Sequence, residues 1–399
     1  IRLNSTHDIS EKLRFGQTLG YSNEKNIGIG NTNSEFGGPL SSAINLDPLT
    51  PVVERDPIFA NQAPYTNNGI WKDANGHPYG ISSIVAQEMS NPLAYQESRR
   101  GNYGWADNFV GNAYLEYEPI EGLKLRSTIG AKLAYWGYKS FTPVSYLNAS
   151  TVVTQNNISQ GTNRGLGWNL ENTISYSKTF DKHNFSMLLG QGVYVDNNSF
   201  GENVTYYDIP VYNYKQASFN FSVPQDQIVA SSYEGIEHRV TSLFSRLTYD
   251  YDEKYLLTAI FRRDGSSRFG ANNKFGFFPS FSAGWVPSKE NFWQDNDIIN
   301  QLKIRGGFGV TGNDNIGDFR YLSTIGGGRN YALGNPGSIT IGNSPNAPSN
   351  PDLKWEETSQ LNIGFDTRLF NDISLSFDWY KKTTTGILQN IAIPGYVGA

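Results

Sequence analysis

The stretch VTSLFSRLTYDYDEKYLLTAIFRRDGSSRFGANNKFGFFPSFSAGW, residues 240–285, carries the pattern that decides the expected fold. Near its start, Leu243 and Leu247 alternate with polar side chains such as Arg246. A second alternating run, residues 255–262, follows a short Asp-Glu-Lys turn. Period-two alternation on two runs that are joined by a tight polar turn predicts a β-hairpin.

A third run, residues 275–285, follows the sequence DGSSRFG and a short loop, and it extends the hairpin to three strands. In these runs one side is apolar and often aromatic, and the other side is mostly polar. Two settings produce such a pattern. One is a water-facing sheet over a core, and the other is a membrane barrel whose polar face is turned toward the lumen.

The same alternation recurs along the chain and predicts about eleven strands in total. The other eight strands are expected near residues 13–21, 109–117, 123–135, 168–176, 185–193, 302–310, 361–369 and 373–380. Short connections fall near residues 119, 181, 252 and 371, with 286–300 as a longer member of that group. Long connections fall near residues 22–106, 139–163, 196–235 and 312–353.

Strand length and loop asymmetry favour a membrane barrel. The strands run to about ten residues, which suits one bilayer crossing. Short periplasmic turns that alternate with long extracellular loops are typical of outer-membrane barrels. We therefore expect an all-β fold, an antiparallel transmembrane β-barrel with long extracellular loops. Because bacterial barrels close with an even number of strands, a count of eleven indicates a partial barrel or a count that is wrong by one.

Composition excludes several other classes. Of the 399 residues, 38% are hydrophobic and only 17% are charged, while Gly (41), Tyr (24) and Phe (23) are abundant. The net charge of −5 and the lack of any Lys/Arg run argue against nucleic-acid binding. Cysteine is absent, which removes disulfides and thiol chemistry. No apolar run approaches the ~20 residues of a spanning helix, so we expect membrane contact through strands.

Several segments resemble the SusC/RagA family of TonB-dependent outer-membrane transporters of Bacteroidetes. They are FRRDGSSRFG at 261–270, NKFGFFPSFSAGW at 273–285, LKIRGGFGVTGN at 302–313, NPLA at 91–94 and NPDLKWE at 350–356. The resemblance implies a large barrel in the bacterial outer membrane that imports oligosaccharides or peptides. It also implies a SusD-like surface lipoprotein as lid and coupling to the TonB complex. Compared with the family, residues 1–399 are expected to be a portion of one barrel domain, without the plug domain, the TonB-contacting segment and the last strands.

Two groups of residues are candidates for a substrate path. Arg262, Arg263, Asp264 and Arg268 could line it, and the alternative is an ion-paired turn at the top of a strand. Among aromatic residues of the long loops, Trp71, Tyr79 and Tyr212 could stack on sugar rings, and the alternative is packing within the loops themselves.

No catalytic, cofactor or metal site is expected. Residues 307–312 fit GxGxxG, but a loop and not a helix is expected after them. The four histidines are scattered, and the acidic pairs Asp295/Asp297 and Asp314/Asp318 do not follow the EF-hand pattern, so we expect solvated loop acids, with a Ca²⁺ site in a loop as the alternative. No arrangement of an enzyme active site can be singled out, so we expect a protein without catalytic activity.

The first functional hypothesis is the barrel part of an outer-membrane nutrient importer. The alternatives are a soluble all-β carbohydrate-binding protein and a passive porin. In the barrel, the side chains expected to face lipid are Leu243, Leu247, Tyr249, Leu257, Phe261, Leu361, Ile363, Phe365, Leu375 and Phe377. Those expected to face the lumen are Arg246, Thr248, Thr258, Arg262, Asp366, Arg368 and Asp378.

Overall fold

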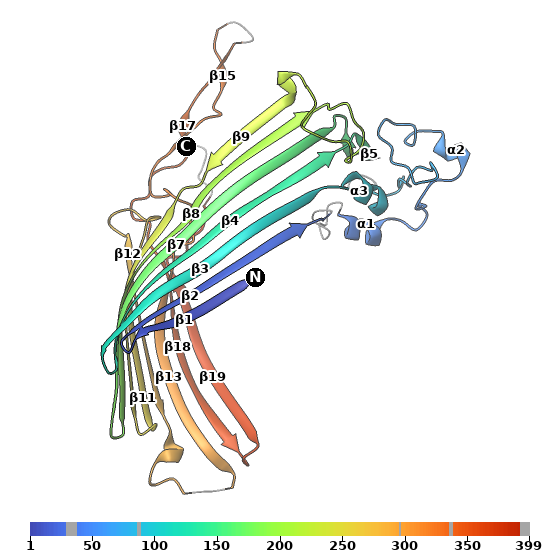
Figure 1. The fold of residues 1–399 in the computed structure, drawn as a ribbon. Coiled ribbons are helices and arrows are strands. Elements are labelled where there is room, and N and C mark those ends of the chain that lie inside the picture. Colours follow the sequence, from blue (N-terminus) through green and yellow to red (C-terminus); the bar gives the residue numbers. More distant parts are fainter. Residues whose placement is uncertain (29–37, 86–88, 295–296, 335–337, 392–399) are drawn as a thin grey trace.

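The structure is a computed structural model that describes residues 1–28, 38–85, 89–294, 297–334 and 338–391. Its main element is one antiparallel sheet whose strands neighbour each other in chain order (Figure 1). The path consists of β1 (Arg2–Ser10), β2 (Leu13–Asn26), β3 (Tyr103–Ile120), β4 (Leu123–Thr142), β7 (Asn157–Phe180), β8 (His183–Tyr207), β10 (His238–Tyr251), β11 (Tyr255–Ser266), β12 (Phe275–Trp285), β13 (Ile299–Asn313), β18 (Glu356–Leu369) and β19 (Ile373–Thr385). A further strand, β9 (Ile228–Glu234), pairs with the end of β8.

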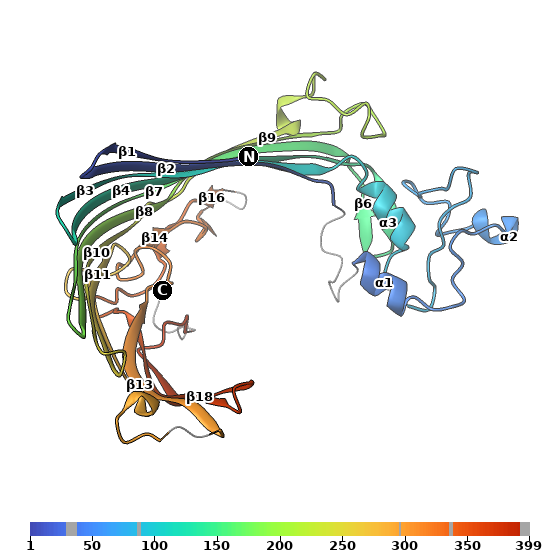
Figure 2. The same ribbon diagram turned by 60° about the horizontal axis from the view of Figure 1, so that its bottom comes forward.

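The sheet bends into a trough, which Figure 2 shows as a curved wall that runs from β1 round to β18. Within the described residues, β1 pairs with β2 and β19 pairs with β18, so each edge strand has one unpaired side. An unpaired strand edge in a bilayer would leave backbone N–H and C=O groups without partners, and closed barrels avoid this. The trough therefore has the geometry of a segment of a barrel wall.

The expected count of about eleven strands is one too low for this path, which contains twelve. The additional strand is β1, whose sequence RLNSTHDIS is mostly polar and lacks a regular apolar side. The pairing of β1 with β2 along nearly its whole length defines it as a strand. The path thus has an even number of strands, so the strand count no longer indicates a partial barrel.

Tight turns connect the strands at one end of the sheet. Asp181, Asp252 and Asn371 have positive φ angles of 51°, 53° and 60° in these turns. Left-handed turn residues match the right-handed twist of the flanking strands. Gly122 has a φ of 83°, and a Cβ atom there would lie 2.2 Å from the carbonyl oxygen of Ser177. Glycine is therefore required by both the backbone angle and the space.

The long connections all lie at the other end and contain the small elements. These are α1 (Pro39–Asn45), α2 (Pro57–Ala60), α3 (Pro92–Ser98), β5 (Ser145–Asn148), β6 (Thr151–Val153), η1 (Gln225–Gln227), β14 (Ile325–Gly326), β15 (Tyr331–Ala332), β16 (Ile339–Thr340) and β17 (Ser344–Pro345). The longest tight-turn connection carries η2 (Pro287–Lys289). None of the described helices is long and apolar enough to cross a membrane.

The bounds expected for the long connections need correction. They span 27–102, 143–156, 208–227 and 314–355 in the structure, compared with the expected 22–106, 139–163, 196–235 and 312–353. Most are shorter because strands continue past the predicted ends, and β7 and β8 reach 24 and 25 residues. A bilayer crossing requires only ~9–11 residues, so these strands extend well beyond it.

Two small cores stabilise the long-connection end. The first consists of Phe141, Ile158, Ile209, Val211 and Ala217. The second consists of Phe269, Phe278 and Trp355. Both cores pack a long connection against strand ends, so the connections are held by burial and not only by hydrogen bonds.

Candidate functional site

The register of the sheet sorts the strand side chains into two faces. Directly paired residues lie on the same side of a sheet. Leu247 pairs with Ala259, which pairs with Phe281, and this row continues through Phe308 to Leu361. The ten side chains expected to face lipid all belong to this face, and the seven expected to face the lumen belong to the other.

The apolar face is not a protein core. Leu243, Ile363 and Phe377 expose 61%, 51% and 53% of their surface. A soluble protein would bury a continuous apolar face of this size, so the arrangement fits contact with lipid. We refer to this side as the outward face and to the opposite side as the inward face.

The inward face borders a hollow of about 1370 Å³. Its lining includes Thr179 on β7, Thr258 on β11, Ser282 on β12 and Arg305 on β13. A continuous hollow that reaches across these strands fits the concave side of the trough. The inward face is therefore the lumenal side of the wall.

Arg262 and Asp264 form an ion pair on the inward face near the long-connection end of β11. Arg262 Nε donates to Asp264 Oδ2 at 2.6 Å, and the same guanidinium donates to Ser242 Oγ on β10 at 3.0 Å. Asp264 is 8% exposed, and its Oδ1 has no hydrogen-bond partner among the described residues. The pair holds the guanidinium in place at the lumenal surface.

Other charged groups continue across the inward face. Tyr194 donates its hydroxyl proton to Glu171 at 2.9 Å, which joins β8 to β7. Arg305 on β13 donates to both Asp366 on β18, at 3.0 Å, and Asp378 on β19, at 2.8 Å. The inward face therefore carries positive and negative side chains next to each other, which suits polar solutes of mixed charge.

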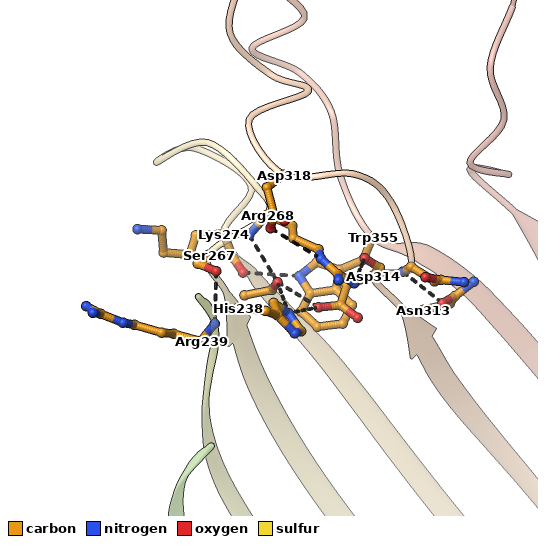
Figure 3. A network of polar contacts seen from close by, with 11 residues as sticks. His238, Arg239, Ser267, Arg268, Lys274, Asn313, Asp314, Asp318 and Trp355 are labelled. Carbon is orange, nitrogen blue, oxygen red and sulfur yellow. Dashed lines mark hydrogen bonds and ion pairs between the residues drawn. The ribbon is translucent and has the colours of Figure 1, made fainter. Parts of the chain in front are cut away.

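A polar network anchors the connection 314–355 at the mouth of the trough (Figure 3). The Asp314 carboxylate lies 2.8 Å from His238 Nε2 and accepts from Ser266 Oγ at 2.7 Å. Arg268 donates to the Asp314 carbonyl oxygen at 3.2 Å and pairs with Asp318 at 3.5 Å. The start of the connection is therefore attached to the ends of β10 and β11.

Aromatic packing supports the same anchor. The ring centroids of Phe269 and Trp355 are 5.2 Å apart, and those of Phe278 and Trp355 are 5.3 Å apart. Trp355 Nε1 donates to the carbonyl oxygen of Lys274 at 3.1 Å. Because Trp355 lies just before β18, this core fixes the other end of the connection as well.

The structure separates the candidates from the DGSSRFG region. Arg262 and Asp264 lie together on the inward face, as a substrate path requires. Arg263 pairs with Leu243 and Phe277 and therefore belongs to the outward face. Consecutive strand residues point to opposite sides, so Arg263 cannot line the same path as Arg262. Arg268 is engaged in the anchor network.

The aromatic candidates do not form one cluster. Trp71 and Tyr79 are half-buried neighbours, and the Tyr79 N–H donates to the Trp71 carbonyl oxygen at 3.0 Å. Tyr212 lies in another connection and is 85% exposed. It is the freest of the three to contact a ligand or a partner.

We searched the described part of the chain for side chains that could form the metal or nucleotide site considered in the sequence analysis. That part of the chain contains no group of three or more His, Cys, Asp or Glu side chains that could hold a metal ion. Asp295 lies outside the described residues. Residues 307–312 lie within β13, which is followed by a loop and not by a helix.

Sequence reasoning missed Arg305, Glu171 and Tyr194 as site residues. Alternation places Arg305 on the same side of its strand as Lys303, which was a usable signal. Its contacts with Asp366 and Asp378 require the register of three strands, and that register is not written in any one of them.

Comparison with known proteins identifies the family. A family model described as TonB dependent receptor-like, beta-barrel matches residues 14–399. TonB-dependent receptor P39 of Formosa agariphila is 34% identical over 414 residues, which cover 97% of this chain and 37% of that protein. TonB-dependent receptor SusC of Bacteroides thetaiotaomicron is 28% identical over 395 residues, which cover 96% of this chain and 37% of that protein. The chain thus spans 37% of the length of these two relatives.

A solved structure shares the fold. The RagAB peptide importer in its "closed-closed" state matches all of this chain and 41% of its own chain, with a TM-score of 0.75 and 22% identity. The matches confirm the resemblance to SusC/RagA proteins and the antiparallel barrel fold. This chain belongs to the TonB-dependent receptor-like β-barrel family, whose members are outer-membrane proteins.

Proposed function

We propose that this chain forms part of the barrel wall of a TonB-dependent nutrient importer, without catalytic activity of its own. The observation that carries the proposal is the contrast between the two faces of the same strands. The outward face is apolar and exposed, and the inward face carries ion pairs such as Arg262–Asp264 and Arg305–Asp366 beside a large hollow. Such a wall separates lipid from an aqueous passage.

The substrate is proposed to be an oligosaccharide or a peptide. Inward side chains of both charges, together with hydroxyl groups that line the hollow such as those of Thr258 and Ser282, can bind the backbone and termini of peptides and the hydroxyl groups of sugars. One protein with a similar fold is named a peptide importer, and one relative is named SusC. Both names agree with uptake of polar nutrients.

The partners are proposed to be a SusD-like surface lipoprotein and the TonB complex. The long connections all leave the strands at the same end of the sheet, where a lid could rest on them (Figure 1). The anchor of connection 314–355 at the mouth provides a fixed base at that end. Coupling to TonB would pass through a plug region that does not belong to this wall.

The test is energy-dependent uptake by the full-length protein. Cells that express it are given labelled oligosaccharide and peptide pools, with and without a functional TonB complex. We expect uptake of one pool to require TonB. Uptake that persists without TonB would support the passive porin instead, and uptake of neither pool would overturn the importer proposal.

A matched pair of variants tests the passage itself. Arg262→Gln removes an inward guanidinium, and Arg263→Gln removes an outward one from the next residue. We expect a lower uptake rate for Arg262→Gln and an unchanged rate for Arg263→Gln, at equal amounts of barrel in the outer membrane. Equal rates for both variants would remove Arg262 from the passage.

A further inference from the structure

Arg263 is a cation on the lipid-facing side of the wall. On β11 the outward residues Tyr255, Leu257, Ala259 and Phe261 form an apolar run, and Arg263 ends it. Its guanidinium lies 4.0 Å from the centre of the Phe275 ring. Among the described residues, Arg263 has no carboxylate partner in an ion pair. Neither the proposed passage nor the anchor network uses this side chain.

The direction of the Arg263 side chain indicates how deep its guanidinium lies in the bilayer. Its cross-strand partner on β12 is Phe277, whereas Phe275 is paired with Gly265, two positions nearer to the long-connection end. The side chain therefore leans toward that end of the wall. Arginine residues near the border of a bilayer behave in this way, with the stem on apolar surface and the charge at headgroup level.

The surface below the guanidinium is a bed of phenyl rings. Phe261, Phe277 and Phe281 are 40%, 55% and 45% exposed. The Phe261 and Phe277 rings are stacked at 6.3 Å, and the Phe261 and Phe281 rings meet edge to face at 5.3 Å. An apolar bed with a cation at its long-connection edge matches an amphipathic molecule with an anionic head.

A second outward cation lies on β10, four residues beyond the cross-strand partner of Arg263 toward the long-connection end. Arg239 is on the outward face of β10, paired with Val195. Its side chain is 68% exposed and extends away from the anchor network in Figure 3. Arg239 forms an ion pair with Glu237, to which Nε donates at 2.9 Å and a terminal N–H of the guanidinium also donates, and these bonds lower the pKa of the Glu237 carboxyl. The guanidinium keeps further N–H groups for another acceptor.

Other strands repeat the arrangement. Lys25 on β2, Arg164 on β7 and Lys381 on β19 also lie on the outward face toward the long-connection end, each beyond an apolar stretch. At the tight-turn end the outward face carries Lys178 on β7. The cations are thus concentrated at the end that faces the outside of the cell in outer-membrane barrels.

We propose that Arg263 binds a phosphate group of an outer-leaflet lipid whose acyl chains lie on Phe261, Phe277 and Phe281, and that Arg239, farther toward the long-connection end, binds a second phosphate group of the same lipid head. Guanidinium groups bind phosphate oxygens in bidentate fashion, and the position at the border of the apolar band places them at headgroup depth. Because the phenyl bed continues directly below Arg263, the occupant needs both an anionic head and apolar chains. The interaction surface is separate from the lumenal passage.

The test uses the full-length protein in neutral detergent micelles, with diphosphorylated lipid A as the probe and native mass spectrometry as the readout. Removal of one cation at the membrane surface weakens binding about fivefold, so we expect that loss for Arg263→Gln and about 25-fold for Arg239→Gln/Arg263→Gln. Two controls lose an equal charge elsewhere. Arg262→Gln lies on the inward face, and Lys178→Gln lies at the opposite end of the outward face, so both should keep the original affinity.

Several results would overturn the proposal. One is equal affinity for fully dephosphorylated lipid A, and another is an equal loss of affinity in Lys178→Gln. A third is displacement of the lipid by inorganic phosphate alone at millimolar concentration, because the phenyl bed would then contribute nothing. If Arg263→Gln does not fold, Phe275→Leu removes the ring that holds the guanidinium, and about threefold weaker binding is expected. Unchanged binding in that variant would also contradict the proposal.

Discussion

Two pairs of consecutive residues with the same chemistry show how differently the two faces of this wall are built. Phe278 faces inward and is 6% exposed against Trp355, whereas Phe277 faces outward and is 55% exposed. Arg262 faces inward and is held by Asp264 and Ser242, whereas Arg263 faces outward and lies over a phenyl ring. Residue type alone therefore does not predict the contacts of a side chain in this wall. The environment that a strand position faces decides what the side chain does.

The largest expected contrast is between the two phenylalanines. Phe278→Ala opens a cavity in the core with Phe269 and Trp355, and it should destabilise the protein by about 3–5 kcal/mol. Phe277→Ala should lower the free energy of unfolding by only about 1.5–3 kcal/mol, the value of moving one such side chain from water into lipid. No cavity forms at this position, because lipid fills the space that the ring leaves. Urea unfolding in lipid vesicles measures both values. Equal values would mean that Phe278 is not packed as the structure describes.

A charge placed on either face gives the next contrast. Ile363 lies in the middle of the outward run of β18, and Ile363→Arg should lower the free energy of unfolding by about 2–4 kcal/mol. The neighbouring inward variant, Asn362→Arg, places the same cation beside water and should change it by less than about 1 kcal/mol. The same unfolding measurement compares them. A neutral Ile363→Arg together with a damaging Asn362→Arg would reverse the assignment of the faces.

The two arginines provide a smaller contrast. Arg262→Gln leaves the buried Asp264 carboxylate without its ionic partner and should cost about 1–2 kcal/mol. Arg263→Gln, on the exposed outward face, should leave the stability in lipid-free detergent unchanged. Arg262→Gln/Asp264→Asn should regain most of the loss, because the uncompensated charge is gone. A double variant as unstable as Arg262→Gln would show that the ion pair is not the cause.

Alternation along single strands made the two faces predictable. In β10, β11, β18 and β19 one side meets lipid along the whole crossing, so the apolar period is regular. The prediction failed where a strand lacks a regular apolar side or continues past the bilayer. The mostly polar β1 was missed, and the ends of β7 and β8 beyond the bilayer were assigned to loops.

The candidate site was predictable only in part. Alternation separates Arg262 from Arg263, so naming both for one path disregarded a signal that the sequence contains. The contacts of Arg305 with Asp366 and Asp378 join residues that are 61 and 73 positions apart. They depend on the register between strands, which turn length and distant packing set together.

The contrast between a lipid-facing and a water-facing side should vanish outside the bilayer, where hydrogen bonds should stabilise the connections together with the two small cores. Asp47, in the connection between β2 and β3, accepts hydrogen bonds from the hydroxyl groups of Ser82 at 2.5 Å and Thr50 at 2.7 Å. These bonds lower the pKa of the Asp47 carboxyl below its usual range. Their contribution to stability is therefore complete above the unfolded-state pKa of about 3.9 and is lost as the pH falls through the folded-state pKa.

We accordingly expect amide hydrogen exchange around residues 47–50 and 82–85 to be slow from pH 7 to about pH 5 and to accelerate below about pH 4, after correction for the intrinsic rate.

In the Asp47→Asn variant these amides should exchange faster at neutral pH, because the side-chain amide of Asn offers no charged oxygen to accept the same hydrogen bonds. Acidification should then change the exchange rates of this variant little. Segments of the wall such as β10 provide the internal reference, because their protection depends on lipid contact and on the strand ladder. If the wild-type protein and Asp47→Asn share one pH profile, the carboxylate does not hold this connection, and burial would dominate outside the bilayer as it does within the two cores.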